Sequence, residues 1–407
     1  MAGLTPLTAL RALRVGHGHP PLAAPSSVVS TLESQFRAEP SGSGDDGYRP
    51  DDSHVWTPVE TAIATIPVGG PVQDIVVSAD GEHVYVARSD SVEVIDGRHW
   101  IVGSIPFSGA AKSVVTRAHG NQLFVVDYDG SVSVVDTRDY TAQMLWGGRA
   151  SATVVSPDGR HLYVAHDQVT EGRAGGAVSV IETASATTVA IVPVNDVAAL
   201  AISPDGGRLY AVSCERRTYY QYPAGRLSII DTVGHAVVET IAVGACPETA
   251  AASPDGAHLY ITHYDTFSVS AVNLTTGSVA AVGLRDAPLT VVFSPDSSHA
   301  YVCNVGSFTV IDTATHEGDD ILACDLPRGL QLSPDGKRAY IANLGDGTLS
   351  VFDTITNSVP TTVDVPGYPE TVAVSPDGER IYVGDYWSGA VAVISVPTVR
   401  NLHADAG

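Results

Sequence analysis

Basic side chains are scarce in this chain, and their scarcity narrows the choice of partners. The 407 residues include 22 lysines and arginines against 45 aspartates and glutamates, so the formal net charge is −23. A surface of that sign repels other polyanions. Neither nucleic acid nor anionic membrane is therefore expected as a partner, and solubility is the simplest use of the excess charge.

Cysteines are also few, and long apolar runs are missing. Cys214, Cys246, Cys303 and Cys324 show no CxxC spacing and are too few for a disulfide framework. Free structural thiols are expected, with pairing of Cys214 and Cys246 left open. No run reaches the 18 or so apolar residues of a membrane span, and the N-terminus lacks the apolar core of a secretory signal. We therefore expect a cytoplasmic protein.

One pattern is abundant: a turn of the type Ser-Pro-Asp-Gly, followed by an aromatic residue. The aromatics recur at intervals of 39 to 50 residues, which is close to the roughly 40–45 residues of a four-stranded propeller blade. The eight aromatics are Tyr85, Phe124, Tyr163, Tyr210, Tyr260, Tyr301, Tyr340 and Tyr382. The period predicts a repeat architecture in which one blade is built around each aromatic.

Each copy reads as four strands. In Ser156-Pro157-Asp158-Gly159, proline presets φ for a tight turn and glycine takes the position with positive φ. The turn joins a short strand of small apolar residues to the strand that carries the aromatic, and two further strands follow. Alternation within these strands indicates that neighbouring blades cover both faces. We predict an all-β fold, a single closed β-propeller with eight blades, seven being the alternative.

The two ends of the count indicate how the ring closes. The last copy stops after its third strand, near Val396, while an unpaired strand over 61–68 precedes the first copy. Pairing of that N-terminal strand with the last blade is the economical arrangement. The predicted organisation is an extension and linker over 1–57, in which leucines at helical spacing could form a short helix, a propeller over 58–398 and a tail over 399–407.

These repeats resemble the YVTN β-propeller family, a group of WD40-like propellers. Its tetrad begins at the aromatic, and here the tetrads are YVAR, FVVD, YVAH, YAVS, YITH, YVCN, YIAN and YVGD. The resemblance covers residues 58–398 and implies the fold. It leaves the activity open, since relatives include surface-layer and periplasmic binding proteins, and similar propellers occur in lactonases and in metal- or quinone-linked oxidoreductases. The terminal asparagine survives only as Asn304 and Asn343.

The fourth residue of each tetrad is expected at the ring edge that surrounds the central channel. Polar groups in that place suit a small-molecule or peptide site, although strand ends can also be polar simply because they are wet. The candidate binding residues of this kind are Asp127, His166, His263, Asn304, Asn343 and Asp385.

Catalytic and metal-binding patterns are weak. The chain has no G-x-S-x-G, no HExxH and no phosphate-cradling glycine loop, so no catalytic residue and no cofactor are assigned. His166 and His263 could suggest a metal site. They occupy equivalent positions two blades apart, however, and stacked sheets lie about 10 Å apart, so the two cannot share one ion. No metal is expected.

Two long insertions give the strongest local signal. From the aromatic to the end of the third strand takes 19 residues in the third copy and 21 in the fourth, against 11 to 13 elsewhere. Both insertions are expected as loops on the channel-mouth side of neighbouring blades. The second concentrates tyrosine and arginine, which interfaces favour as anchors, although a tolerated surface insertion would look the same. Its candidate residues are Arg216, Arg217, Tyr219, Tyr220 and Tyr222.

These observations favour a monomeric, non-catalytic binding or interaction module. One propeller face, around the loops of the third and fourth blades, is predicted to bind a protein, a peptide or a small ligand. The alternative is a propeller enzyme of lactonase or lyase type with an active site at the channel mouth. An enzyme needs several ionisable groups converging on one point, whereas a binding module needs only a complementary patch.

Overall fold

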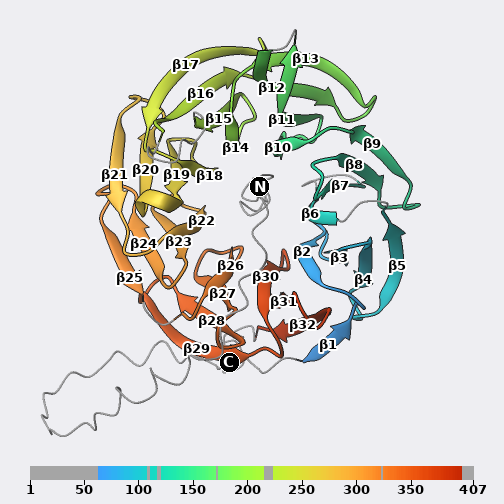
Figure 1. The fold of residues 1–407 in the computed structure, drawn as a ribbon. Helices are drawn as coiled ribbons and strands as arrows, with labels where there is room; N and C mark the ends of the chain where they lie inside the picture. The colour runs from blue at the N-terminus through green and yellow to red at the C-terminus, as the bar shows by residue number, and fades with distance from the viewer. Residues whose placement is uncertain are drawn as a thin grey trace, which may run out of the picture. The chain divides into compact units, whose positions relative to one another are not determined.

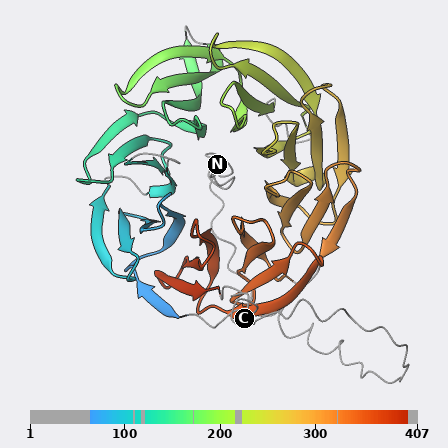
Figure 2. The same ribbon diagram turned by 180° about the vertical axis from the view of Figure 1, so that it is seen from behind.

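Eight four-stranded sheets are arranged in a ring, as Figures 1 and 2 show from opposite sides. The computed structural model describes residues 63–107, 111–116, 121–170, 173–214, 223–321 and 324–396, and of 167–174 only the backbone. In these residues the ring is an all-β propeller with eight blades, as the repeat predicts, and the seven-blade alternative is wrong. The predicted extension over 1–57 and tail over 399–407 lie outside the described residues.

The blades follow one another in chain order, and within each blade the strands run from the channel outward. Blades I to IV are β2 (Val72–Val77), β3 (His83–Arg88), β4 (Ser91–Asp96) and β5 (Ile101–Pro106); β6 (Ala111–Thr116), β7 (Gln122–Asp127), β8 (Val132–Asp136) and β9 (Ala142–Trp146); β10 (Ala150–Val155), β11 (His161–Thr170), β12 (Arg173–Glu182) and β13 (Thr187–Pro193); β14 (Val197–Ile202), β15 (Arg208–Cys214), β16 (Gly225–Asp231) and β17 (Ala236–Val243).

Blades V to VIII repeat this plan, with one short 3-10 helix, η2 (Tyr264–Thr266), after the second strand of blade V. Their strands are β18 (Pro247–Ala252), β19 (His258–His263), β20 (Ser268–Asn273) and β21 (Val279–Gly283); β22 (Pro288–Phe293), β23 (His299–Asn304), β24 (Phe308–Asp312) and β25 (Gly318–Ile321); β26 (Pro327–Leu332), β27 (Arg338–Asn343), β28 (Thr348–Asp353) and β29 (Ser358–Asp364); β30 (Pro369–Val374), β31 (Arg380–Asp385), β32 (Ala390–Ser395) and β1 (Ala64–Pro67).

The last strand of blade VIII comes from the other end of the chain. β1 pairs antiparallel with β32, with Ala64 opposite Val393 and Pro67 opposite Ala390. The prediction that an N-terminal strand closes the ring is confirmed. Closure of this kind turns the outer edge of β32, which would otherwise be unpaired, into an internal strand.

Burial follows the position of a strand in its blade. The second and third strands are almost wholly buried, because neighbouring sheets cover both of their faces, while the outermost strands are mostly exposed. The repeated aromatic lies at the centre of this packing, and Tyr260, Tyr301, Tyr340 and Tyr382 are among the largest fully buried side chains. Burying an aromatic of this size in every blade supplies apolar contact throughout the ring.

The Ser-Pro-Asp-Gly turns also connect blades, which the sequence pattern did not indicate. Within a turn, Ser156 accepts the Gly159 amide through its carbonyl at 2.7 Å, and its hydroxyl donates to Asp158. Between turns, the glycine of one blade packs against the proline of the blade before it. A Cβ at Gly336, where φ is +71°, would lie 2.6 Å from Cδ of Pro295. Glycine there permits both the backbone conformation and the close approach.

Candidate functional site

The second strands of all blades end on one side of the ring. We call this side the mouth face; it consists of the connections from second to third strands and those from fourth strands to the next blade. In blade VII, for example, the connection from the second to the third strand is residues 344–347, and the connection into blade VIII is residues 365–368. The Ser-Pro-Asp-Gly turns lie at the opposite ends of the same strands, so the mouth face is separated from them by the length of a strand.

The six candidate tetrad residues end the second strands of six different blades, apart from His166, where the strand continues. All six are buried: His263, Asn304 and Asn343 are 0 % exposed, and none of the set exceeds 8 %. The sequence left open that these residues are polar only because strand ends contact water; in the structure they are buried instead. Each side chain meets polar groups of its own blade or of the connection that leads into it, and the structure distributes the six around the ring.

Their partners follow a common geometry. His263 Nε2 lies 2.8 Å from the Ser270 hydroxyl, and Asn343 Nδ2 donates to the Ser350 hydroxyl at 2.8 Å. In each case the hydroxyl sits two residues beyond the residue directly opposite on the third strand, which is Ser268 for His263. This diagonal places the two side chains on one face of the sheet, within reach of each other.

A polar residue recurs at this diagonal position, and sequence reasoning missed it. The signal was present in the third strands as a single polar letter inside an apolar run, for example in SVSAVN and TLSVFD. Pairing it with the tetrad end requires the strand register, which the pattern alone did not give. The diagonal residues of blades I to VII are Glu93, Ser133, Ser179, Ser228, Ser270, Thr309 and Ser350.

His263 is held as a neutral imidazole. Burial lowers the pKa of His263 from its ordinary value of 6.5 to about 4. Its Nδ1 lies 2.9 Å from the carbonyl oxygen of Ala245, and Gly244 packs against the ring so closely that a Cβ there would lie 2.7 Å from Nε2. A histidine in such a place serves as a neutral hydrogen-bonding group of the core at physiological pH.

Asp127 is a second buried group whose neutral form is favoured. Burial raises the pKa of Asp127, although the Ser131 hydroxyl donates to Oδ2 at 2.9 Å. Among the described residues, its Oδ1 is buried without a hydrogen-bond partner, as are the Oδ1 atoms of Asn304 and Asn343. Buried acceptors of this kind weaken the native state by about 1–3 kcal/mol each unless a water meets them.

The carboxylate of Asp385 accepts backbone hydrogen bonds from the connection that follows β31. Its Oδ1 accepts the backbone amide of Trp387 at 2.8 Å and that of Ser388 at 3.2 Å. Gly367, with φ at +95°, lies directly over the carboxylate, and a Cβ there would overlap Oδ2. Asp385 therefore fixes a turn instead of presenting its charge to solvent.

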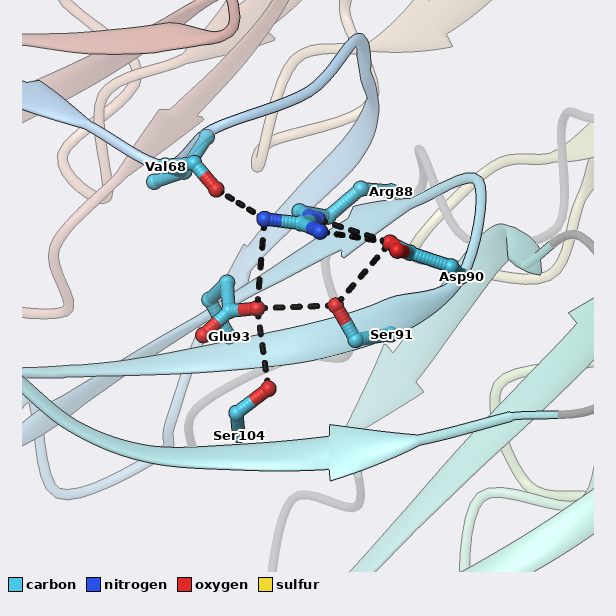
Figure 3. Close-up of polar contacts among 6 residues, drawn as sticks. All are labelled: Val68, Arg88, Asp90, Ser91, Glu93 and Ser104. Carbon is cyan, nitrogen blue, oxygen red and sulfur yellow. Dashed lines mark hydrogen bonds and ion pairs between the residues drawn. The ribbon is translucent and has the colours of Figure 1, made fainter.

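Blade I carries a charged network at the same level, which Figure 3 shows. Arg88 ends β3, donates to the carbonyl oxygen of Val68 and forms ion pairs with Asp90 at 2.6 Å and Glu93 at 3.5 Å. Glu93 also accepts the Ser104 hydroxyl at 2.9 Å. Val68 follows the closing strand β1, so this network stabilises the junction between blade I and the strand that closes the ring, here called the seam.

The long insertion of blade III is a hairpin rather than the expected loop. β11 and β12 stay paired through four further residue pairs, from Asp167–Gly176 to Thr170–Arg173. At about 3.3 Å per residue, this adds roughly 13 Å to the hairpin beyond the tetrad end. The insertion of blade IV, with Arg216, Arg217, Tyr219, Tyr220 and Tyr222, lies outside the described residues.

Exposed aromatic side chains on the mouth face were not singled out from the sequence. Tyr128 directly follows the second strand of blade II, Trp387 lies two residues past that of blade VIII, and both are exposed, as are Phe267 and Tyr368. Their signal was an aromatic immediately after the tetrad or before the next blade. Single exposed aromatics are common on protein surfaces, and they indicate a contact site only where they form a contiguous patch.

The described part of the chain contains neither a disulfide nor a cluster of metal-ligating side chains. All four cysteines are free, and burial raises the pKa of Cys324 to about 11, so this thiol stays protonated. No group of three or more histidine, cysteine, aspartate or glutamate side chains in those residues could hold a metal ion. The expectations of no metal and no cofactor remain predictions. None of the described helices is long and apolar enough to span a membrane.

The arrangement defines an eight-bladed β-propeller whose mouth face carries a projecting hairpin and exposed aromatics. Among solved structures, the chain resembles hydrazine synthase from Kuenenia stuttgartiensis, with 22% identity, a TM-score of 0.54, and coverage of 86% of this chain and 99% of that one. It also resembles a chain in the mitotic checkpoint complex, with 14% identity, a TM-score of 0.55, and coverage of 89% and 100%. No protein-family model and no curated protein matches. At these identities the likeness shows the fold alone.

Proposed function

We propose that this propeller is a non-catalytic binding module that captures a protein, peptide or small ligand on its mouth face, around the connections of blades III and IV. The observation that carries the proposal is the β11–β12 hairpin. Its two strands have ten residues each, whereas the second and third strands of the other blades have five to seven. A paired hairpin is a stiffer contact element than an open loop of the same length, so it loses less conformational entropy on binding.

The burial of the tetrad ends supports a surface made of connections. Since His166, His263 and the asparagines are enclosed by neighbouring blades, a ligand would meet the segments that project beyond them. The exposed aromatics Tyr128 and Phe267 lie on the same face. Aromatic side chains with few rotatable bonds are the residues that interfaces use as anchors.

A loop exchange tests the proposal. Residues 167–176 are replaced by Tyr-Asp-Gly, the tight turn that connects the same strands in blade II as Tyr128-Asp129-Gly130. The intact and shortened chains are each used to select from a phage-displayed library of random peptides. We expect a common motif to be enriched on the intact chain and lost on the shortened one, with equal melting temperatures. Enrichment of the same motif on both chains would refute a role for the hairpin.

We also infer that the chain is a YVTN-repeat propeller. Eight tetrads that begin at a buried aromatic support this assignment, and in the seven blades other than blade II a tight turn precedes the strand that carries the aromatic. Asparagine is kept at the fourth tetrad position only in blades VI and VII. The departures elsewhere are compatible with the YVTN assignment, because histidine or aspartate is buried at the equivalent position of four other blades.

A further inference from the structure

The connections of blades VII and VIII form one continuous surface on the mouth face. The turn at Gly347 packs against the connection into blade VIII, where a Cβ on Gly347 would lie 3.1 Å from the carbonyl oxygen of Gly367. That connection is tied in turn to the end of β31, because the Tyr386 amide donates to the Tyr368 carbonyl at 3.3 Å. The three segments are therefore neighbours through their backbones.

Aromatic rings dominate this surface. Trp387 is 64 % exposed and Tyr368 is 52 % exposed, and the Tyr386 and Trp387 rings meet edge to face with their centroids 5.1 Å apart. The turn that carries Trp387 is held by the Asp385 carboxylate, which accepts two of its backbone amides. The indole is thus presented to solvent from a fixed backbone.

The segments that form this surface are rich in acidic residues. Segments 324–328, 344–348, 364–370 and 385–390 contain five acidic residues and one basic residue, and one of the five, Asp385, is buried. Asp325, Asp346 and Asp364 are exposed, and a Cβ on Gly345 would lie 2.6 Å from the Asp325 carboxylate. Burial raises the pKa of the Cys303 thiol in blade VI well above its ordinary value, and the charge of Arg328 opposes that rise only in part, which places Arg328 near blade VI. Acidic side chains thus outnumber basic ones on these segments.

We propose that this surface binds an arginine side chain of a partner peptide. A guanidinium is planar and weakly hydrated, so it can stack on an indole or phenol ring while its edges donate to carboxylates. The exposed rings of Tyr368 and Trp387 offer the stacking faces, and Asp325 and Asp346 offer the acceptors. The site lies across the ring from the hairpin of blade III (Figure 1) and does not depend on it.

The test uses the full chain and a short probe, acetyl-Gly-Arg-Gly-Arg-Gly-amide, titrated by calorimetry. The same peptide with citrulline in place of arginine keeps the shape and removes the charge, and it should bind about tenfold more weakly. Trp387→Ala should weaken binding of the arginine peptide about fivefold. Trp100→Ala is the matched control, because Trp100 is similarly exposed, at 70 %, but lies in the connection between β4 and β5 of blade I, on the face opposite the mouth face.

Two further variants separate the possible explanations. Asp325→Asn/Asp346→Asn should weaken binding by a similar factor to Trp387→Ala, and added salt should weaken binding to the unaltered chain. The chain with the shortened blade III hairpin should bind the probe unchanged, so failure of the hairpin proposal would not be mistaken for failure of this one. Equal binding of the citrulline peptide, or equal effects of Trp387→Ala and Trp100→Ala, would overturn the assignment.

Discussion

Replacing His263 with asparagine should remove a specific part of the acid sensitivity of the fold. Asparagine already occupies the equivalent position of blades VI and VII, where Asn343 Nδ2 donates to the diagonal hydroxyl of Ser350. The substitution therefore keeps a hydrogen bond to Ser270 and removes a titrating ring. It also removes the contact with Ala245, so the change with pH is the informative quantity, not the absolute stability.

The magnitude follows from the pKa values. His263 has a pKa of about 4 in the folded chain and an ordinary value of 6.5. The unfolded chain binds the proton more tightly, so stability is complete above pH 6.5 and falls as the pH drops toward 4. Between pH 7 and pH 5 this amounts to about 2 kcal/mol. For a domain of this size, that loss corresponds to roughly 4 °C in Tm.

Differential scanning calorimetry at several pH values between 7 and 5 provides the measurement. We expect the Tm of the His263→Asn variant to fall about 4 °C less over this range than that of the unaltered chain. Ser213→Asn is the control, because it introduces asparagine at the same position of blade IV without removing a histidine. If His263→Asn keeps the full pH dependence, the imidazole is not the buried neutral group described above, and the argument fails.

Three further substitutions examine the turns, the seam and the buried carboxyl. Gly336→Ala should lower the free energy of unfolding by about 2 kcal/mol or more, and Gly256→Ala by only about 1 kcal/mol. The backbone strain should be nearly equal in the two variants, since φ is +71° and +72°. A Cβ, however, would lie 2.6 Å from a proline at the first position and 3.8 Å from one at the second. Arg88→Met should cost about 3 kcal/mol by leaving buried Glu93 without its ion-pair partner, since the Ser91 and Ser104 hydroxyls are neutral donors, and adding Glu93→Gln should recover part of that loss. Asp127→Asn should stabilise the chain by about 1 kcal/mol at pH 7 and have less effect at pH 3, because a raised pKa means that stability is lost as the carboxyl ionises.

Urea denaturation followed by circular dichroism measures all three. Equal losses in the two glycine variants would show that the turns of neighbouring blades do not press on one another. A double variant at the seam that is less stable than Arg88→Met alone would show that Glu93 is stabilising in itself. Destabilisation by Asp127→Asn at pH 7 would mean that the ionised carboxylate has a partner that compensates its burial.

The sequence located many residues of the candidate site along the chain, but it did not show whether they are buried or which residues they contact. The tetrad ends were located at the ends of second strands, and the third and fourth copies were recognised as extended. Their burial depended on how closely the next blade covers a strand end, which a single repeat does not reveal. Whether an insertion continues as paired strands, as residues 167–176 do, depends on backbone pairing that its glycine-rich sequence did not indicate.

The sequence by itself determined the architecture. A period of about 40 residues, a turn motif with proline and glycine in defined places, and a buried aromatic in each copy leave few alternatives to a propeller, and the missing last strand required Ala64–Pro67 to close the ring. These are local or periodic properties, so they can be read from one copy and counted. The tertiary structure decided what meets across blades: the glycine of one turn against the proline of another, Arg88 against the closing segment, and the turn at Gly347 of blade VII against the connection into blade VIII. Such contacts join residues of different blades, and they arise only when the fold sets each blade against its neighbour.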